Sequence, residues 1–233
     1  MGTEWINDFR IEDGKLTGYI GEYGDVAFPQ GISEITSVLH WRDELTSVSI
    51  PNTVVSIGRQ AFQHCTNLDN VVLPNSVVSI GNSAFERCFS LTRIIIPNGV
   101  SKIGGFAFDS CTSMQEIIIP DSVVSLGRAA FQNCTALIRI TLSSRMEDIE
   151  VGTFYGCKSL KKVIVPNSVS WIKAGAFASC NAMTEILIPA SVEYIGGSVF
   201  ESCPFLQICG SSGSIAEKYA KENRIPFKVV EST

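Results

Sequence analysis

Cysteine and histidine are the residues of this chain that could most directly do chemistry, as nucleophiles, metal ligands or disulfide partners. The 233 residues include eight cysteines and two histidines. A regular spacing of cysteines indicates a repeated fold rather than one reactive site. Seven of them recur with a period of 23 residues, at Cys65, Cys88, Cys111, Cys134, Cys157, Cys180 and Cys203.

Stacked repeats would place successive cysteine Cα atoms about 4.8 Å apart, within the disulfide range of about 4.4–6.8 Å. Their side chains would run parallel, however, whereas a disulfide needs Cβ atoms about 3.8 Å apart and turned toward each other. The C-x-x-C pairs of zinc sites are absent. We therefore expect a ladder of reduced, buried cysteines. Cys209 falls outside the period, and we expect it at the inward strand position held by Val48, Val71 and Ile94.

The other candidate groups form no catalytic motif. His64 adjoins Cys65, but one of two neighbouring side chains would face inward and the other outward, so the two form no dyad. Neither G-x-S-x-G, a Walker loop nor H-E-x-x-H occurs. Glu147, Asp148 and Glu150 lack the spacing of a calcium loop, and we expect a solvated face there. The sequence predicts no enzyme, no cofactor and no metal site.

The repeat predicts the elements that carry these residues. Each unit reads approximately L-x-x-I-x-I-P-N-S-V-x-x-I-G-x-x-A-F-x-x-C, and phenylalanine keeps the same period from Phe62 to Phe200. A fixed period of this length is typical of a stacked solenoid and lies in the leucine-rich-repeat range. We expect a right-handed leucine-rich-repeat superhelix, β-rich, with a parallel sheet on one face.

Each unit divides into a strand and two turns. In the segment LTRIIIP, strand alternation points Ile94 and Ile96 inward, and Arg93 and Ile95 outward. V-x-x-I-G then turns the chain across a second edge. We expect A-F-x-x-C to form one helical turn. The stacking would place the phenylalanine rings about 5 Å apart, a favourable distance for aromatic pairs.

Both ends differ from the repeat, as the ends of a solenoid must if they are to cover its core. Asp13-Gly14 predicts a type I′ hairpin turn, and Ser214 with Glu217 predicts the capping box of a short C-terminal helix. We expect one domain with three parts: a hairpin cap at 1–28, an array of about eight coils at 29–209, and a helix–strand cap at 210–233.

Composition excludes several classes of protein. The apolar share of 45% argues against a disordered chain, and the net charge of −5 argues against nucleic-acid binding. No apolar run of 18 residues is present to span a membrane. The N-terminal MGTEWINDFR has neither the basic nor the apolar region of a signal peptide.

The units LTRIIIPNGVSKIGGFAFDSC and LDNVVLPNSVVSIGNSAFERC resemble the BspA-like class of bacterial leucine-rich repeats. The flanking EDGKLTGYIG and GSIAEKYAKEN resemble the flanks common in that class. The resemblance implies a binding or adhesion role toward a protein, for example a host or matrix protein, with no shared catalytic residues. It also implies an extracellular or cell-surface location, although the absence of a signal peptide leaves a cytoplasmic one open.

Two columns of side chains are expected on the outer face of the sheet. One is charged and predicts lateral ion pairs, Arg93–Glu116–Arg139 and Lys162–Glu185. The other is apolar where water is expected. Its members could form a partner surface, or they could reflect the preference of strands for β-branched residues. The candidates in it are Val72, Ile95, Ile118, Ile164 and Leu187.

A local feature gives a further candidate. Trp171 and Tyr194 occupy equivalent turns of adjacent coils and could serve a protein or a sugar. Three hypotheses follow: a protein-binding or adhesion module using the sheet face, a self-associating structural module, and a carbohydrate-binding module centred on the two aromatics. We favour the first, with a monomer rather than a homodimer.

Overall fold

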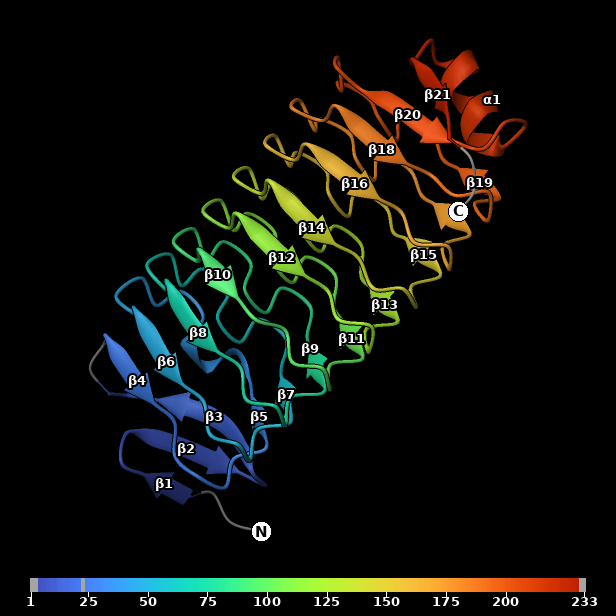
Figure 1. Cartoon of the computed structure of the whole chain (residues 1–233). Coiled ribbons are helices and arrows are strands. Elements are labelled where there is room, and N and C mark those ends of the chain that lie inside the picture. The colour runs from blue at the N-terminus through green and yellow to red at the C-terminus, as the bar shows by residue number, and fades with distance from the viewer. Residues whose placement is uncertain (1–3, 22–23, 231–233) are drawn as a thin grey trace.

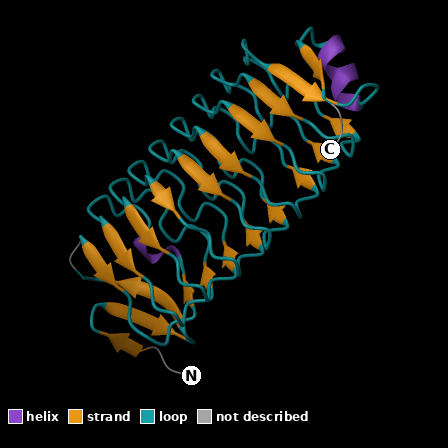
Figure 2. Cartoon of the chain, in the orientation of Figure 1, coloured by secondary structure: helices purple, strands orange, loops and turns teal. Residues whose placement is uncertain are grey.

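The computed structural model describes residues 4–21 and 24–230. As predicted, the chain forms a β-solenoid of about nine coils with parallel sheets and one short helix at the C-terminal end. Figures 1 and 2 show the coils stacked along one axis, with the strands of one face aligned side by side.

The front sheet takes one strand from each coil. Its pairing is parallel and continuous from β4 to β10, from β12 to β14, and from β16 to β21, so two seams interrupt the ladder, between β10 and β12 and between β14 and β16. β4 lies within the segment expected as an N-terminal cap. The strands are β4 (Asp25–Ala27), β6 (Ser47–Ser49), β8 (Asn70–Val72), β10 (Arg93–Ile94), β12 (Glu116–Ile118), β14 (Arg139–Thr141), β16 (Lys162–Ile164), β18 (Glu185–Leu187), β20 (Gln207–Gly210) and β21 (Phe227–Val229).

A second ladder of two-residue strands, here called the back ladder, follows V-x-x-I-G. Its glycine is required where coils approach: a Cβ at Gly104 would lie 2.5 Å from the backbone nitrogen of Asn82. The strands of the back ladder are β5 (Glu34–Ile35), β7 (Ser56–Ile57), β9 (Ser79–Ile80), β11 (Lys102–Ile103), β13 (Ser125–Leu126), β15 (Asp148–Ile149), β17 (Trp171–Ile172) and β19 (Tyr194–Ile195).

The third edge carries A-F-x-x-C, and the prediction of a helical turn there is wrong. The N–H of Phe108 donates to the carbonyl of Ala130 in the next coil at 2.8 Å. Phe106 and Ser110, two residues to either side, have φ of +57° and +60°. The backbone thus alternates in hand and turns its hydrogen bonds toward the neighbouring coil. These bonds between coils replace the i→i−4 bonds that a helix would form.

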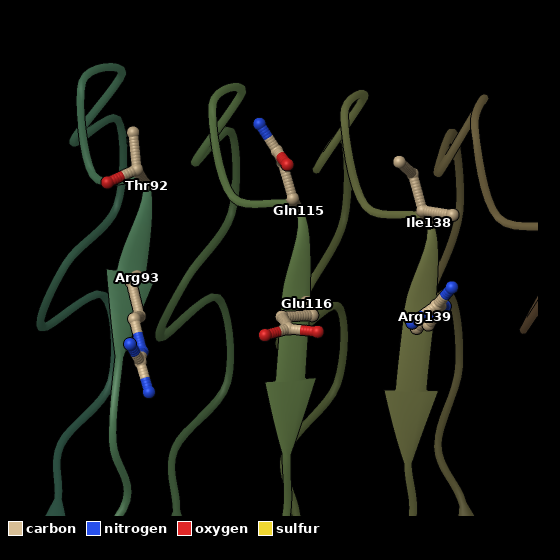
Figure 3. A pocket seen from close by; sticks show the side chains of 6 residues that line it. All are labelled: Thr92, Arg93, Gln115, Glu116, Ile138 and Arg139. Atoms are coloured by element: carbon tan, nitrogen blue, oxygen red, sulfur yellow. The ribbon is translucent and has the colours of Figure 1, made fainter.

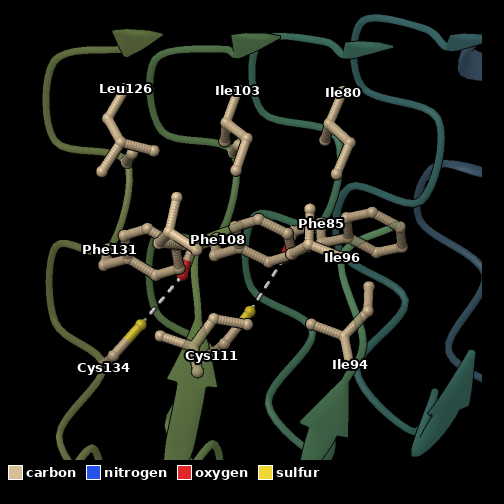
Figure 4. Packing of buried hydrophobic residues seen from close by; sticks show 14 of the residues in the cluster. Ile80, Phe85, Ile94, Ile96, Ile103, Phe108, Cys111, Leu126, Phe131 and Cys134 are labelled. Atoms are coloured by element: carbon tan, nitrogen blue, oxygen red, sulfur yellow. Dashed lines mark hydrogen bonds between the residues drawn. The ribbon is translucent and has the colours of Figure 1, made fainter. Parts of the chain in front are cut away.

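The core contains the two ladders that the period predicts. Phenylalanine rings from Phe62 to Phe200 stack at centroid distances of 5.2–5.8 Å, and their planes differ by at most 16°. All eight cysteines are free, which confirms a reduced ladder. In Figure 4 the thiols of Cys111 and Cys134 donate to carbonyls of the preceding coil. Burying these groups removes a large apolar surface from water, which stabilises the stack.

The position of Cys209 differs from the prediction. It lies in register with Leu187, an outward position, while Ile208 takes the inward position beside Ile186. The register moves because Glu185 pairs with Gln207, 22 residues later, whereas the other strand pairs of this sheet region keep the period of 23. Cys209 is still buried, with β21 paired alongside it.

The N-terminal end forms the predicted hairpin. β2 (Phe9–Glu12) and β3 (Lys15–Tyr19) pair antiparallel, and both Asp13 and Gly14 have positive φ, +49° and +74°, as a type I′ turn requires. β1 (Glu4–Ile6) adds a third antiparallel strand. A 3-10 helix, η1 (Ser37–Leu39), follows in the first irregular coil.

The C-terminal end forms the predicted helix α1 (Ile215–Glu222). The hydroxyl of Ser214 accepts a hydrogen bond from the N–H of Glu217 at 3.3 Å. The Glu217 carboxylate accepts from the N–H of Gly213 at 2.6 Å, so the orphan donors of the first turn are satisfied.

Candidate functional site

The front sheet exposes a line of aliphatic side chains, here called the apolar row. Val72, Ile95, Ile118 and Ile164 are 69%, 66%, 67% and 69% exposed, respectively. Parallel pairing holds them in line, because successive outward positions of neighbouring strands lie side by side. Thr141, in register with Ile118, interrupts the row with a polar side chain.

Leu187 is placed differently from the other four candidates. It is in register with Ile164 but only half-exposed. It lines a pocket of about 450 Å³ together with Ile164 and Val230. The C-terminal segment therefore borders this end of the apolar row.

The charged column beside the apolar row forms only part of the predicted ion pairs. Lys162 and Glu185 pair at 3.3 Å, as predicted. The prediction of Arg93–Glu116–Arg139 pairs is wrong: within residues 4–21 and 24–230 these three side chains form no ion pair. Figure 3 shows each of them lying along its own strand. Their charges are directed to solvent rather than to one another.

Three pockets follow the row across strands β8 to β14. One of about 660 Å³ lies between β8 and β10 and includes Val72 and Ile95. Another of about 220 Å³ lies at the seam between β10 and β12 and includes Ile95 and Ile118. The third, about 420 Å³, is the polar one in Figure 3, lined by Thr92, Arg93, Gln115, Glu116, Ile138 and Arg139. Shallow grooves beside exposed aliphatic groups can receive the side chains of another protein.

Trp171 and Tyr194 lie apart from the apolar row, on the back ladder. They pair in register between β17 and β19, and are 48% and 50% exposed. Their ring centroids are 5.6 Å apart, but the planes are tilted by 50°. The structure thus does not bring the two sets of candidate residues together.

The acidic face near Trp171 is more ordered than the sequence suggested. Lys173 pairs with Asp148 at 3.0 Å and with Glu150 at 2.6 Å. The hydrogen bond to Glu150 raises the pKa of Lys173, although burial opposes the shift. A lysine in the glycine position of this coil therefore balances the two carboxylates that precede it.

One exposed aromatic pair was missed in the sequence. Trp41 stacks on His64 with ring centroids 3.5 Å apart and planes 14° apart, and Trp41 is 62% exposed. Burial, and then the positive charge of Arg87, lowers the pKa of His64. The signal was available, because Trp41 precedes His64 by the period of 23 residues.

Within the part of the chain that the structure describes, no group of three or more histidine, cysteine, aspartate or glutamate side chains could hold a metal ion. None of the helices in that part is long and apolar enough to cross a membrane.

Comparison with known proteins gives a consistent picture. The family model of the BspA type leucine rich repeat region matches six copies, over residues 33–122 and 101–217. A search of curated proteins finds no match. A leucine-rich repeat protein from Bacteroides ovatus is 24% identical and superposes with a TM-score of 0.75, covering 95% of this chain and 74% of its own.

Two further solved structures share the fold. A leucine-rich repeat protein of T. pallidum is 24% identical, with a TM-score of 0.66 over 92% of this chain and 89% of its own. A leucine rich cell surface protein from Faecalibacterium prausnitzii is 24% identical, with a TM-score of 0.54 over 94% of this chain and 97% of its own. With the repeat, the stacked core and the family match in agreement, this chain belongs to the BspA-type leucine-rich repeat family.

Proposed function

We propose that this chain is a non-enzymatic binding module whose front sheet contacts a partner protein through the apolar row. The observation that carries the proposal is the exposure of Val72, Ile95, Ile118 and Ile164, each about two-thirds open to water. An ordered line of aliphatic groups in water is unfavourable unless it is covered, and such patches commonly mark interaction sites.

Exposed β-branched residues alone do not mark a site. Val55, Val78 and Val124 on the other side of the coils are also 44–48% exposed, and strands favour such residues anywhere. The front sheet differs because the apolar row is bordered by pockets and by the unpaired charges of Arg93, Glu116 and Arg139. A partner with an apolar centre and a polar rim that matches these charges would suit this face.

The partner is expected outside the cell. Members of the BspA-type family are often associated with the cell surface, which supports an adhesive contact with a host or matrix protein. A single continuous core from Phe9 to Ala220 supports the view that the cap at 1–28, the array at 29–209 and the cap at 210–233 act as one domain.

Carbohydrate binding has weaker support. A sugar platform needs aromatic rings that present a common face, and the 50° tilt between Trp171 and Tyr194 does not provide one. The proposal is tested by exchanging two residues of the apolar row for glutamate, Ile95→Glu and Ile118→Glu. Partner capture should be lost while the melting temperature is unchanged, since both side chains are exposed.

A further inference from the structure

The third edge of the solenoid is a directional ladder of backbone donors. In each coil from Phe62 to Phe177, three N–H groups donate to carbonyls of the following coil: those of the phenylalanine and of the residues two before and two after it. In the last of these, Gly175, Phe177 and Ser179 donate to the final coil at 3.1, 3.0 and 2.7 Å. All donors of this edge therefore point toward the C-terminal end.

The final coil repeats this conformation but has no coil after it. Its equivalent donors are Ser198, Phe200 and Ser202, and both serines keep the positive φ, +53° and +59°. Helix α1 covers the middle donor. Burial raises the pKa of Tyr219, and the N–H groups of Val199 and Phe200, which hydrogen-bond its hydroxyl, oppose that shift. In the described part of the chain, the N–H groups of Ser198 and Ser202 have no hydrogen-bond partner.

A pocket of about 480 Å³ lies where these donors end. Ser202 and Glu201 line it from the final coil, and Asn223 and Arg224 line it from the chain just after α1. The Asn223 amide is engaged with the carbonyl of Tyr219 at 2.9 Å. Arg224 enters no ion pair in the part of the chain that the structure describes. Glu201 is the one carboxylate in the lining.

We propose that this pocket binds an oxyanion, a carboxylate or phosphate group of a ligand. The N–H of Ser202 supplies a fixed donor in a turn of alternating backbone hand, an arrangement that forms anion-binding concavities. Arg224 supplies positive charge and a planar set of donors suited to both groups. The Glu201 carboxylate repels the ligand and sets a limit on affinity. This site lies on a different edge from the apolar row and is independent of the function proposed for it.

Amide NMR of the full chain tests the proposal, with sodium phosphate and sodium acetate as the two probes at constant ionic strength and sodium chloride as the control salt. The N–H resonance of Ser202 should move in a saturable way with phosphate, acetate or both, and the active salt identifies the source. The resonance of Ser179 should stay in place, because that N–H already donates to Glu201. A Ser202 resonance that moves with neither probe, or equally with chloride, would overturn the site.

Two substitutions give opposite expectations. Arg224→Gln should weaken binding about tenfold, the loss expected for one charge-assisted contact. Glu201→Gln should strengthen it, which a damaged fold would not do. Arg59→Gln, an exposed arginine far from the pocket, should leave the affinity unchanged. Equal affinities for all three variants and the original chain would contradict the assignment.

Discussion

The thiol of Cys111 donates a hydrogen bond to the backbone carbonyl of Phe85, 3.2 Å away in the preceding coil. The same contact recurs from Cys88 to Cys203 at 3.1–3.2 Å. Each cysteine thus ties its own coil to the phenylalanine of the one before it. The ladder is structural, because the sulfur atoms are committed to backbone carbonyls and lie out of reach of solvent.

The cysteine ladder predicts a loss of stability in alkali. Burial raises the pKa of Cys65 to about 12 and that of Cys203 to about 11, and places that of Cys111 well above its ordinary value of 9.0. Up to that ordinary value the thiols are protonated in both states. At higher pH the unfolded chain loses these protons while the folded chain keeps them. The free energy of unfolding should then fall by about 1.4 kcal/mol per pH unit for each buried thiol.

Urea unfolding at about pH 8 and about pH 10 measures this slope. The control is Cys134→Ala, which removes one buried thiol and should make the slope shallower by one thiol's share. A slope that is the same in both proteins would show that the buried thiols do not carry the effect.

The phenylalanine stack predicts a large loss on truncation. Phe108 is fully buried between rings 5.3 and 5.2 Å away, so Phe108→Ala should lower the free energy of unfolding by about 3–5 kcal/mol. Because coils stabilise only their neighbours, the two halves should also unfold less cooperatively. Urea unfolding followed by circular dichroism tests this. The control Phe89→Ala removes a ring that is 41% exposed and should cost much less, and two equal losses would refute the role of the stack.

The period of 23 residues predicted most of the fold, because each unit must place the same residue types in the same place for coils to stack. It placed Ile95 and Ile118 outward, and it predicted the reduced cysteines and the stacked rings. The hairpin at Asp13-Gly14 followed from turn chemistry alone.

The errors arose where contacts between coils override local pattern. A-F-x-x-C looks helical in isolation, but its N–H groups bond to the next coil. Cys209 was misplaced because one coil is a residue short, and a shift of one residue exchanges the two faces of a strand. Arg93 and Glu116 lie on strands that are not paired across a seam, and strand spacing in one sequence does not reveal a seam.

The chain should be monomeric. The apolar row presents a line of only four aliphatic residues, interrupted at Thr141, which is less than a stable dimer of this size usually buries. Sedimentation velocity over a wide concentration range should give one unchanged species. A concentration-dependent dimer that Ile118→Glu abolishes would favour the self-associating alternative instead.

The exposed pair Trp171 and Tyr194 should not confer sugar binding, because the rings are tilted by 50°. A glycan array probed with the original chain and with Trp171→Ala should show no signal that depends on Trp171. A sugar bound by the first and not by the second would favour the carbohydrate-binding alternative.

The most direct test of the central claim is capture of a partner from host-cell and matrix extracts. It compares the original chain with the double variant Ile95→Glu/Ile118→Glu. The matched control is Val78→Glu/Val124→Glu, which places two charges on the opposite edge at side chains 48% and 44% exposed. Melting temperatures of all three should agree, because none of the four side chains is buried. We predict a protein that the original chain and the control retain and the front-sheet variant does not. Equal retention by all three, or loss only in the control, would contradict binding through the apolar row.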